Sequence, residues 1–124
     1  MYAPLAEPVP APMVLRLIGV LDADLVAAFG ALERGLPGAR NATVLVDVRD
    51  VDVLGESEMD ALASAIGAAR REGRDVRLEA RSLHWRRAAK KHLSAQPPID
   101  AQLRSAVRRT VILAHSHNTK RKRR

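Results

Sequence analysis

A dense group of carboxylates surrounds one serine, Ser57, near the middle of the chain. Such a group could bind a divalent cation, but hard cations need several oxygen atoms that converge on one point. Because these side chains are divided among a predicted strand, a predicted polar loop at residues 50–52 and a predicted helix, we expect either a solvated acidic face or a docking surface for a basic partner. Their position beside Ser57 favours docking. The carboxylates belong to Asp47, Asp50, Asp52, Glu56, Glu58 and Asp60.

Ser57 stands where a predicted strand gives way to a predicted helix. Residues 43–48 are β-branched and apolar, whereas residues 57–71 repeat apolar side chains at the spacing of a helix. With Asp60 three positions on, Ser57 fits a capping box, in which its hydroxyl accepts a hydrogen bond from a free backbone N–H. We expect Ser57 to be a plain N-cap, a phosphorylation site, or both. A phosphate there would add about −1.5 to −2 charge at the positive end of a helix dipole.

Other residues that often carry catalysis form no recognisable pattern. The chain has no cysteine, which excludes disulfides, thiolate metal ligands and cysteine nucleophiles. His84 and His92 are too far apart for a joint metal site on one helix, and His115 and His117 fall in a predicted tail. The sequence contains neither a Gly-x-Ser-x-Gly elbow nor a phosphate-binding glycine loop. We therefore predict a protein that is not an enzyme and that uses neither a metal nor a cofactor.

The segments that must position these side chains alternate between strand and helix patterns from residue 13 to about residue 110. That order favours an α/β fold with a mixed, mostly parallel sheet of about four to five strands, covered by about four helices. Residues 111–114 fit either the last helix or a further strand, because periodicity does not decide so short a run. The predicted strands cover 13–20, 43–48 and 75–80, and the predicted helices begin at Asp22 or Asp24, Ser57, Ser82 and Asp100.

The length of 124 residues favours one domain, which we place at residues 13–114. Residues 1–12 contain four prolines and predict an arm or an edge strand, and residues 115–124 predict a disordered basic tail. The longest apolar runs are far shorter than the ~20 residues of a membrane span. The first twelve residues do not resemble a signal peptide, and the lack of cysteine suits a reducing compartment. We expect a cytoplasmic protein.

The net charge of +7 is unevenly distributed along the chain. Residues 1–83 hold 9 Lys and Arg against 13 Asp and Glu, whereas residues 84–119 hold 7 against 1, and residues 120–124 are all basic. Clustered cations of this kind can bind nucleic-acid phosphates by releasing counterions. Alternatively, the tail is a solvated extension or docks on the acidic cluster. The basic residues that could bind nucleic acid are Arg86, Arg87, Lys90, Lys91, Lys120, Arg121, Lys122, Arg123 and Arg124.

Several short segments, taken in order, resemble the STAS domain, the fold shared by anti-sigma factor antagonists and the cytoplasmic part of sulfate transporters. Gly19-Val-Leu-Asp22 is similar to the Gly-x-Leu-Asp before the family's first helix. Residues 44–54 resemble the strand and turn that enter its signature loop. Residues 70–73 and 76–78 are similar to the end of its second helix and the next strand. The resemblance covers roughly residues 13–95.

The resemblance implies a bacterial, protein-binding regulatory module in transcription control, whose partner is an anti-sigma factor of the ATP-dependent serine kinase type. The family's signature loop reads Asp-Ser-Ser-Gly-Leu, and its second serine, which is phosphorylated, corresponds to Ser57. Because Gly55, Glu56 and Glu58 replace three signature residues, we expect phosphorylation to regulate this protein weakly or not at all. The family equally includes accessory parts of transporter complexes. The residues implied to bind the partner are Asp22, Asp52, Gly55, Glu56, Ser57, Glu58 and Met59.

Overall fold

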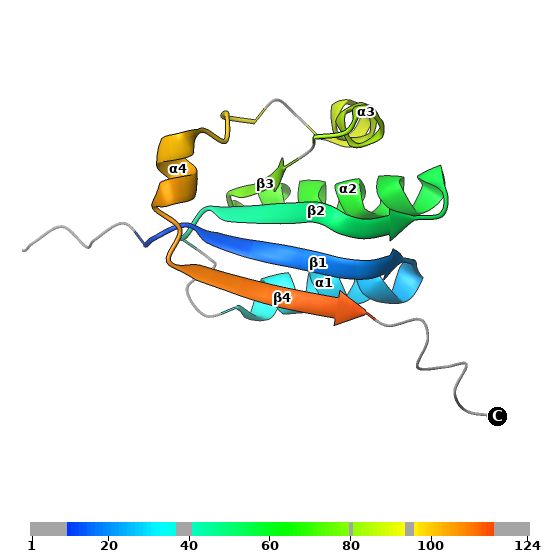
Figure 1. The fold of residues 1–124 in the computed structure, drawn as a ribbon, viewed down its shortest axis with the longest axis horizontal. Helices are drawn as coiled ribbons and strands as arrows, with labels where there is room; N and C mark the ends of the chain where they lie inside the picture. Colours follow the sequence, from blue (N-terminus) through cyan, green and yellow to red (C-terminus); the bar gives the residue numbers. More distant parts are fainter. Residues whose placement is uncertain (1–9, 37–40, 80, 94–95, 116–124) are drawn as a thin grey trace, which may run out of the picture.

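A sheet of four parallel strands forms the centre of the fold (Figure 1). The strands are β1 (Met13–Leu21), β2 (Val44–Val53), β3 (Val76–Glu79) and β4 (Arg109–His115). They lie in the order β3-β2-β1-β4, and every strand pair of the described chain is parallel. This arrangement confirms the predicted α/β fold. The structure, a computed structural model, describes residues 10–36, 41–79, 81–93 and 96–115.

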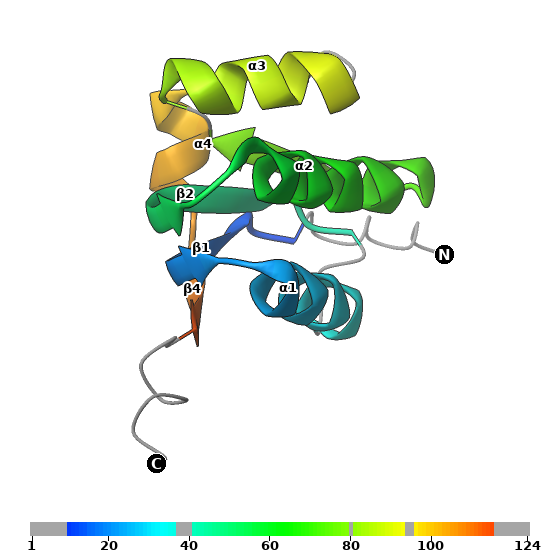
Figure 2. The same cartoon turned by 90° about the vertical axis from the view of Figure 1, so that its right-hand side faces the viewer.

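Two helices, α1 (Ala23–Gly35) and α2 (Glu56–Arg71), pack against one face of the sheet (Figure 2). On the β3 side, α3 (Leu83–His92) packs against α2, and the short α4 (Ala101–Ser105) lies where the strands begin (Figure 1). No helix of the described chain covers the opposite face, which we call the open face (Figures 1 and 2). Parallel sheets are usually covered by helices on both faces, so this arrangement is uncommon.

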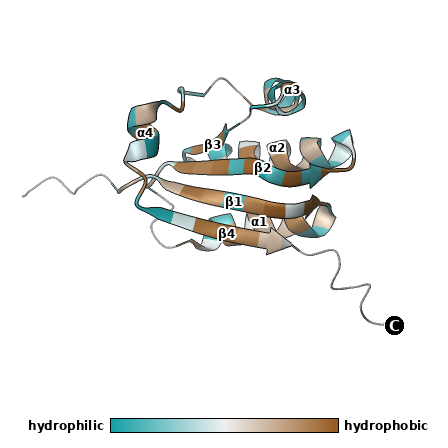
Figure 3. Ribbon diagram, in the orientation of Figure 1, coloured by the Kyte–Doolittle hydropathy of each residue, from teal (hydrophilic) through white to brown (hydrophobic). Residues whose placement is uncertain are grey.

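Side chains of β1 alternate between the two faces of the sheet and differ in burial accordingly. In β1, Met13, Leu15 and Leu17 are buried, and the residues between them are half-buried. In the central strand β2, burial is continuous from Val44 to Val48, which fits the apolar run of the sequence. Figure 3 shows how apolar residues follow the strands. The helices complete the core with Leu25, Phe29, Met59, Leu62 and Ile66.

A shift in the register of β1 and β2 extends β2 beyond its predicted end. The pairing moves by one residue between Arg16 and Ile18, after which β1 and β2 stay paired as far as Leu21 and Val53. Residues 50–52 therefore continue the strand, and the prediction of a polar loop there is wrong. The backbone of these residues pairs with β1, and only the side chain of Val51 turns toward the core, whereas Asp50 and Asp52 are exposed. Two aspartates in so short a segment look like a loop in the sequence, although they belong to a strand that continues past a register shift.

Three predicted helix caps are confirmed by their side-chain hydrogen bonds. Asp22 accepts from the Leu25 N–H at 2.9 Å, Ser82 from the Trp85 N–H at 3.2 Å, and Asp100 accepts similarly at the start of α4. Asp22, rather than Asp24, therefore caps α1.

The structure distinguishes the alternatives that the sequence allows for residues 111–114 and, in part, for residues 1–12. Residues 111–114 form a strand, because α4 ends at Ser105 and the chain then pairs with β1. Residues 10–12 form no strand. The tail predicted at residues 115–124 begins one residue too early, because His115 is the last residue of β4. The rest of the predicted arm, residues 1–9, and the rest of the predicted tail, residues 116–124, lie outside the described residues.

A buried ion pair ties α1 to the connection between α2 and β3. Glu33 is 2% exposed on α1 and binds the guanidinium of Arg74, with 2.8 Å between Arg74 Nη2 and Glu33 Oε1. The hydrogen bond with Glu33 raises the pKa of Arg74 above its ordinary value. Since a buried carboxylate is stable only when it is paired, this contact fixes where the chain turns from α2 toward β3.

Replacing Arg74 with methionine would leave the Glu33 carboxylate buried without a partner. We expect the free energy of unfolding to fall by about 3–5 kcal/mol, measured by urea denaturation. Arg34→Met, at an exposed position of α1, is the control and should change it by less than about 0.5 kcal/mol. The double variant Glu33→Leu/Arg74→Met should regain much of the loss, because it removes both charges. Equal stability of the two single variants would contradict the assigned role of the pair.

Candidate functional site

The predicted partner-binding residues gather at one edge of the sheet. Because the strands are parallel, β1 and β2 end at the same edge, and α1 and α2 both begin there (Figure 1). Ligands of open α/β sheets bind outside the carboxyl ends of the strands. The carboxyl edge of this sheet is therefore the first place to look for a site.

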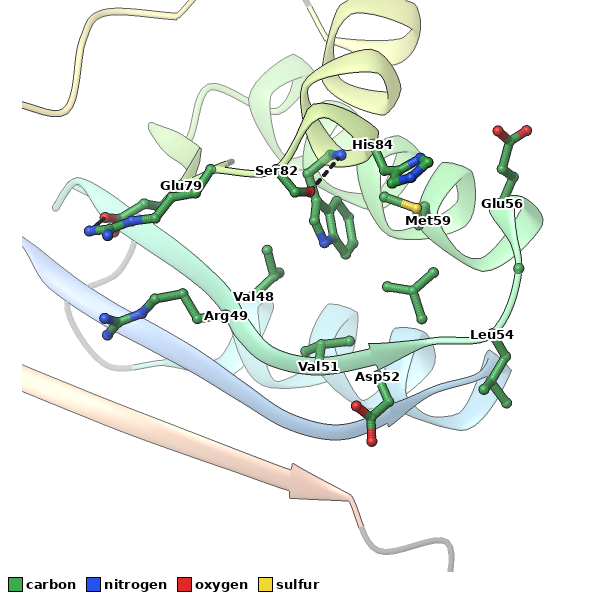
Figure 4. Close-up of a pocket in the computed structure, with 14 residues that line it drawn as sticks. Val48, Arg49, Val51, Asp52, Leu54, Glu56, Met59, Glu79, Ser82 and His84 are labelled. Carbon is green, nitrogen blue, oxygen red and sulfur yellow. Dashed lines mark hydrogen bonds and ion pairs between the residues drawn. The ribbon is translucent and has the colours of Figure 1, made fainter.

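A pocket of about 590 Å³ opens at this edge between β2, the start of α2 and the start of α3. Its inner wall is apolar, formed by the buried side chains of Val48, Met59 and Trp85 and by the half-buried Val51 and Val53. Figure 4 shows Val48 and Val51 on β2 facing Met59 on α2 across this space. The volume is within the usual range of ligand pockets. We call this space the carboxyl-edge pocket.

The two arginines of the pocket rim are neutralised by neighbouring carboxylates. Arg49 Nη2 lies 3.0 Å from Asp47 Oδ2, and Arg81 Nη2 lies 3.2 Å from Glu79 Oε2. Burial alone would raise the pKa of Asp47, but the hydrogen bonds and charge of Arg49 outweigh it and hold that pKa below its ordinary value. Asp47 is thus a buried anion that positions Arg49.

The six-carboxylate cluster divides into two groups of different character. In the first group, each carboxylate forms an ion pair with a basic side chain: Asp47 with Arg49, Asp50 with Arg16, and Asp60 with Lys91. The hydrogen bond from Lys91 lowers the pKa of Asp60. The other three carboxylates have no hydrogen-bond or ion-pair partner among the described residues, and they gather at the β2–α2 loop. These three are Asp52, Glu56 and Glu58.

Ser57 does not cap α2, so the predicted capping box is wrong. The cap position is Gly55, whose extended backbone (φ −165°, ψ 164°) precedes the first helical residue, Glu56. Ser57 is the second helical residue and is exposed. A capping side chain must come from the residue before the helix, and glycine is accepted there without one. The first turn instead carries the carboxylates of Glu56 and Glu58, which suit the positive end of the dipole.

The structure brings four of the seven predicted partner-binding residues to the pocket. Ser57 and Glu58 lie on the first turn of α2, beside the lining residues but not among them. Asp22 holds the start of α1 through its hydrogen bond to Leu25 and does not line the pocket. The four residues that line it are Asp52, Gly55, Glu56 and Met59.

The sequence did not reveal the α3 side of the pocket. The sequence predicts the helix that begins at Ser82, but no local pattern places the start of α3 against the end of β2, because the contact joins distant segments. The one available signal was that the chain's single tryptophan stands at a buried position of a basic helix. The polar and aromatic lining residues that the sequence analysis did not assign to a site are Arg49 on β2, Glu79 on β3, Arg81 before α3, and Ser82, His84 and Trp85 at the start of α3.

The predicted basic residues of α3 form an exposed face away from the sheet. Arg86, Arg87 and Lys90 are exposed and have no hydrogen-bond or ion-pair partner among the described residues. Lys91 differs, because its Nζ lies 3.2 Å from Asp60 Oδ2 and joins α3 to α2. The other predicted nucleic-acid-binding residues, 120–124, lie outside the described residues.

Comparisons of the chain with models of protein families, with curated proteins and with solved structures found no match. Within the described ranges, no three histidine, aspartate or glutamate side chains are grouped so that they could hold a metal ion. The helices between residues 10 and 115 that the structure describes are all too short or too polar to cross a bilayer.

The capping geometry predicts unequal effects of two serine substitutions. Ser82→Ala removes the hydroxyl that accepts from the Trp85 N–H and should lower the free energy of unfolding by about 1 kcal/mol. Ser57→Ala removes no cap and should change it by less than about 0.5 kcal/mol. Urea denaturation of both variants measures the difference. An equal loss in the two variants would mean that Ser57 does cap α2.

Proposed function

We propose that this protein is a protein-binding regulatory module of the STAS type. Its docking surface consists of the β2–α2 loop, the first turn of α2 and the carboxyl-edge pocket. The observation that carries the proposal is the position of an apolar pocket directly beside three carboxylates that have no partner among the described residues, Asp52, Glu56 and Glu58. An apolar centre with a polar rim is the usual anatomy of a protein interface.

The chemistry of the docking surface defines the kind of partner that it fits. The pocket wall of Val48, Met59 and Trp85 can take an apolar anchor side chain, and Leu54, 75% exposed at the rim, adds apolar contact. The rim arginines are already paired, so the remaining charge of the loop is negative. A partner segment with an apolar anchor and flanking Lys or Arg is complementary to this surface.

The resemblance to STAS domains supplies the identity of the proposed partner, an anti-sigma factor of the serine kinase type. A binding role also agrees with the groups that line the pocket. Its hydroxyl, from Ser82, is engaged in capping α3 (Figure 4), and Arg49 and Arg81 are held by carboxylates. This arrangement supports recognition in preference to catalysis.

Phosphorylation of Ser57 would have a limited effect on this docking surface. The hydroxyl is exposed and so accessible to a kinase. However, Glu56 and Glu58 flank it with carboxylates that have no partner among the described residues, so a phosphate adds negative charge where negative charge already prevails. We therefore propose a module whose docking is regulated weakly, or not at all, by modification of Ser57.

The proposal is tested by purifying the kinase-type anti-sigma factor from the same cells and titrating it with this protein in a calorimeter. Glu56→Lys should weaken binding on the order of tenfold, because it reverses a rim charge. Ser57→Asp should weaken binding by less than about threefold. Ala31→Lys, which places the same lysine at an exposed position of α1, is the control and should bind like the unmodified protein.

Two results would overturn this proposal. One is the absence of measurable binding to any such anti-sigma factor. The other is a loss of affinity for Ala31→Lys as large as that for Glu56→Lys, which would indicate a general charge effect.

A second candidate function is nucleic-acid binding through the basic face of α3. The observation that favours it is the exposure of Arg86, Arg87 and Lys90 on one helix without partners among the described residues. Lysine and arginine side chains in this state are free to neutralise phosphates.

The salt dependence of binding to duplex DNA tests the second candidate. If these three cations each contact a phosphate, the Arg86→Ala/Arg87→Ala/Lys90→Ala variant should lower the slope of log affinity against log salt by about 2 to 3. Arg86→Ala/Lys90→Ala, which keeps Arg87 because that residue lies beside Glu56 and Met59, should bind the anti-sigma factor normally, since neither Arg86 nor Lys90 lines a pocket at the docking surface. An unchanged slope would exclude the α3 face as the nucleic-acid contact.

A further inference from the structure

The two edges of the sheet are protected very differently. The outer edge of β3 is covered by the side chain of Gln96, which acts in place of a neighbouring strand. Gln96 Oε1 accepts from the Leu78 N–H at 3.1 Å, and Gln96 Nε2 donates to the Leu78 carbonyl at 3.0 Å. Arg77 donates to the Pro98 carbonyl of the same segment. With only four residues and this cover, β3 offers no edge for further pairing.

The outer edge of β4 has no comparable cover among the described residues. β4 is the last strand of the sheet on its side and pairs only with β1 (Figure 1). From Thr110 to Ala114 no described residue makes a hydrogen bond to this edge. A strand in this position presents a row of unpaired N–H and C=O groups, which is a template for pairing with another chain.

The central residues of β4, 110–114, include none of the usual devices that prevent such pairing. Residues 110–114 read Thr-Val-Ile-Leu-Ala, without a charge, a proline or a glycine. β-branched and apolar residues of this kind are favoured in strands. Ile112 at the centre is 56% exposed, one of the most exposed large apolar side chains of the described chain. Natural edge strands are normally short, charged or bulged.

We propose that two copies of this chain associate through β4, paired antiparallel about a twofold axis at Ile112. The seven residues of β4 then overlap fully, which places Ile112 opposite Ile112 of the second copy. Thr110 lies opposite Ala114, and Val111 lies opposite Leu113. The two sheets become one continuous sheet of eight strands. This interface is separate from the docking surface, which lies beside β2, α2 and α3.

A second copy fits this edge because β4 is complementary to itself. In the antiparallel register, Thr110, Ile112 and Ala114, which are exposed, meet their counterparts on one face. Val111 and Leu113, which are half-buried, meet theirs on the other. Arg109, at one end, is the only lysine, arginine, aspartate or glutamate of the strand, so the centre of the interface contains no like charges. Isologous pairing of this kind closes at a dimer and leaves no edge at β4.

The lack of cysteine makes the register directly measurable in the full-length chain. Cβ atoms of directly opposed residues lie about 4.5–5.5 Å apart, close to the reach of a disulfide. Ile112→Cys should therefore form a covalent dimer under mild oxidation at least ~10-fold faster than Thr110→Cys, whose two copies would lie on the order of 13 Å apart. A mixture of Thr110→Cys and Ala114→Cys should cross-link to each other.

Sedimentation velocity of the same full-length protein gives an independent readout. Ile112→Lys places two lysines opposite each other and should raise the dimer dissociation constant on the order of tenfold. Leu83→Lys is the matched control, because Leu83 is 58% exposed on α3 and away from β4. It should leave the dimer unchanged. A protein that is monomeric at all concentrations, or equal cross-linking rates for Ile112→Cys and Thr110→Cys, would overturn the proposal.

Discussion

The parallel pairing of β1 with β2 is the constraint on which the rest of the structure depends. It brings the carboxyl ends of both strands, and so the starts of α1 and α2, to one edge. The register shift within this pair then turns Arg49 and Asp50 to the exposed side of β2 while Val51 and Val53 remain half-buried. Without that shift, the residues that wall the carboxyl-edge pocket would face the opposite side of the sheet.

The features that could be predicted from the sequence, such as the helix caps, depend only on residues close together in the chain. Asp22, Ser82 and Asp100 each precede a helix and satisfy a backbone N–H three residues later, a rule that needs no knowledge of distant segments. The sequence around Ser57 fits the same rule, but Ser57 is not a cap, because the helical backbone already begins at Glu56. The start of a helix is set by backbone angles, and a glycine at the cap position leaves no side-chain signal of where those angles change.

The pocket could be predicted only in part, because it joins segments that are far apart in the chain. Its β2–α2 side follows from a strand that runs directly into a helix, a continuous stretch of sequence. Its other side depends on where α3 lies, and that is decided by the packing of Trp85 and Ala88 and by the ion pair between Lys91 and Asp60. Asp60 therefore belongs to the scaffold of the site, although in the sequence it looks like one more member of the acidic cluster.

The position of Trp85 has a consequence for spectroscopy. It is the chain's single tryptophan, it is 5% exposed, and it forms part of the pocket wall. Indole emission depends on the polarity around the ring, so the tryptophan fluorescence of the unlabelled protein comes from the wall that the proposed anchor side chain would touch. The fold thus carries its own optical reporter of whether the pocket is filled with water or with protein.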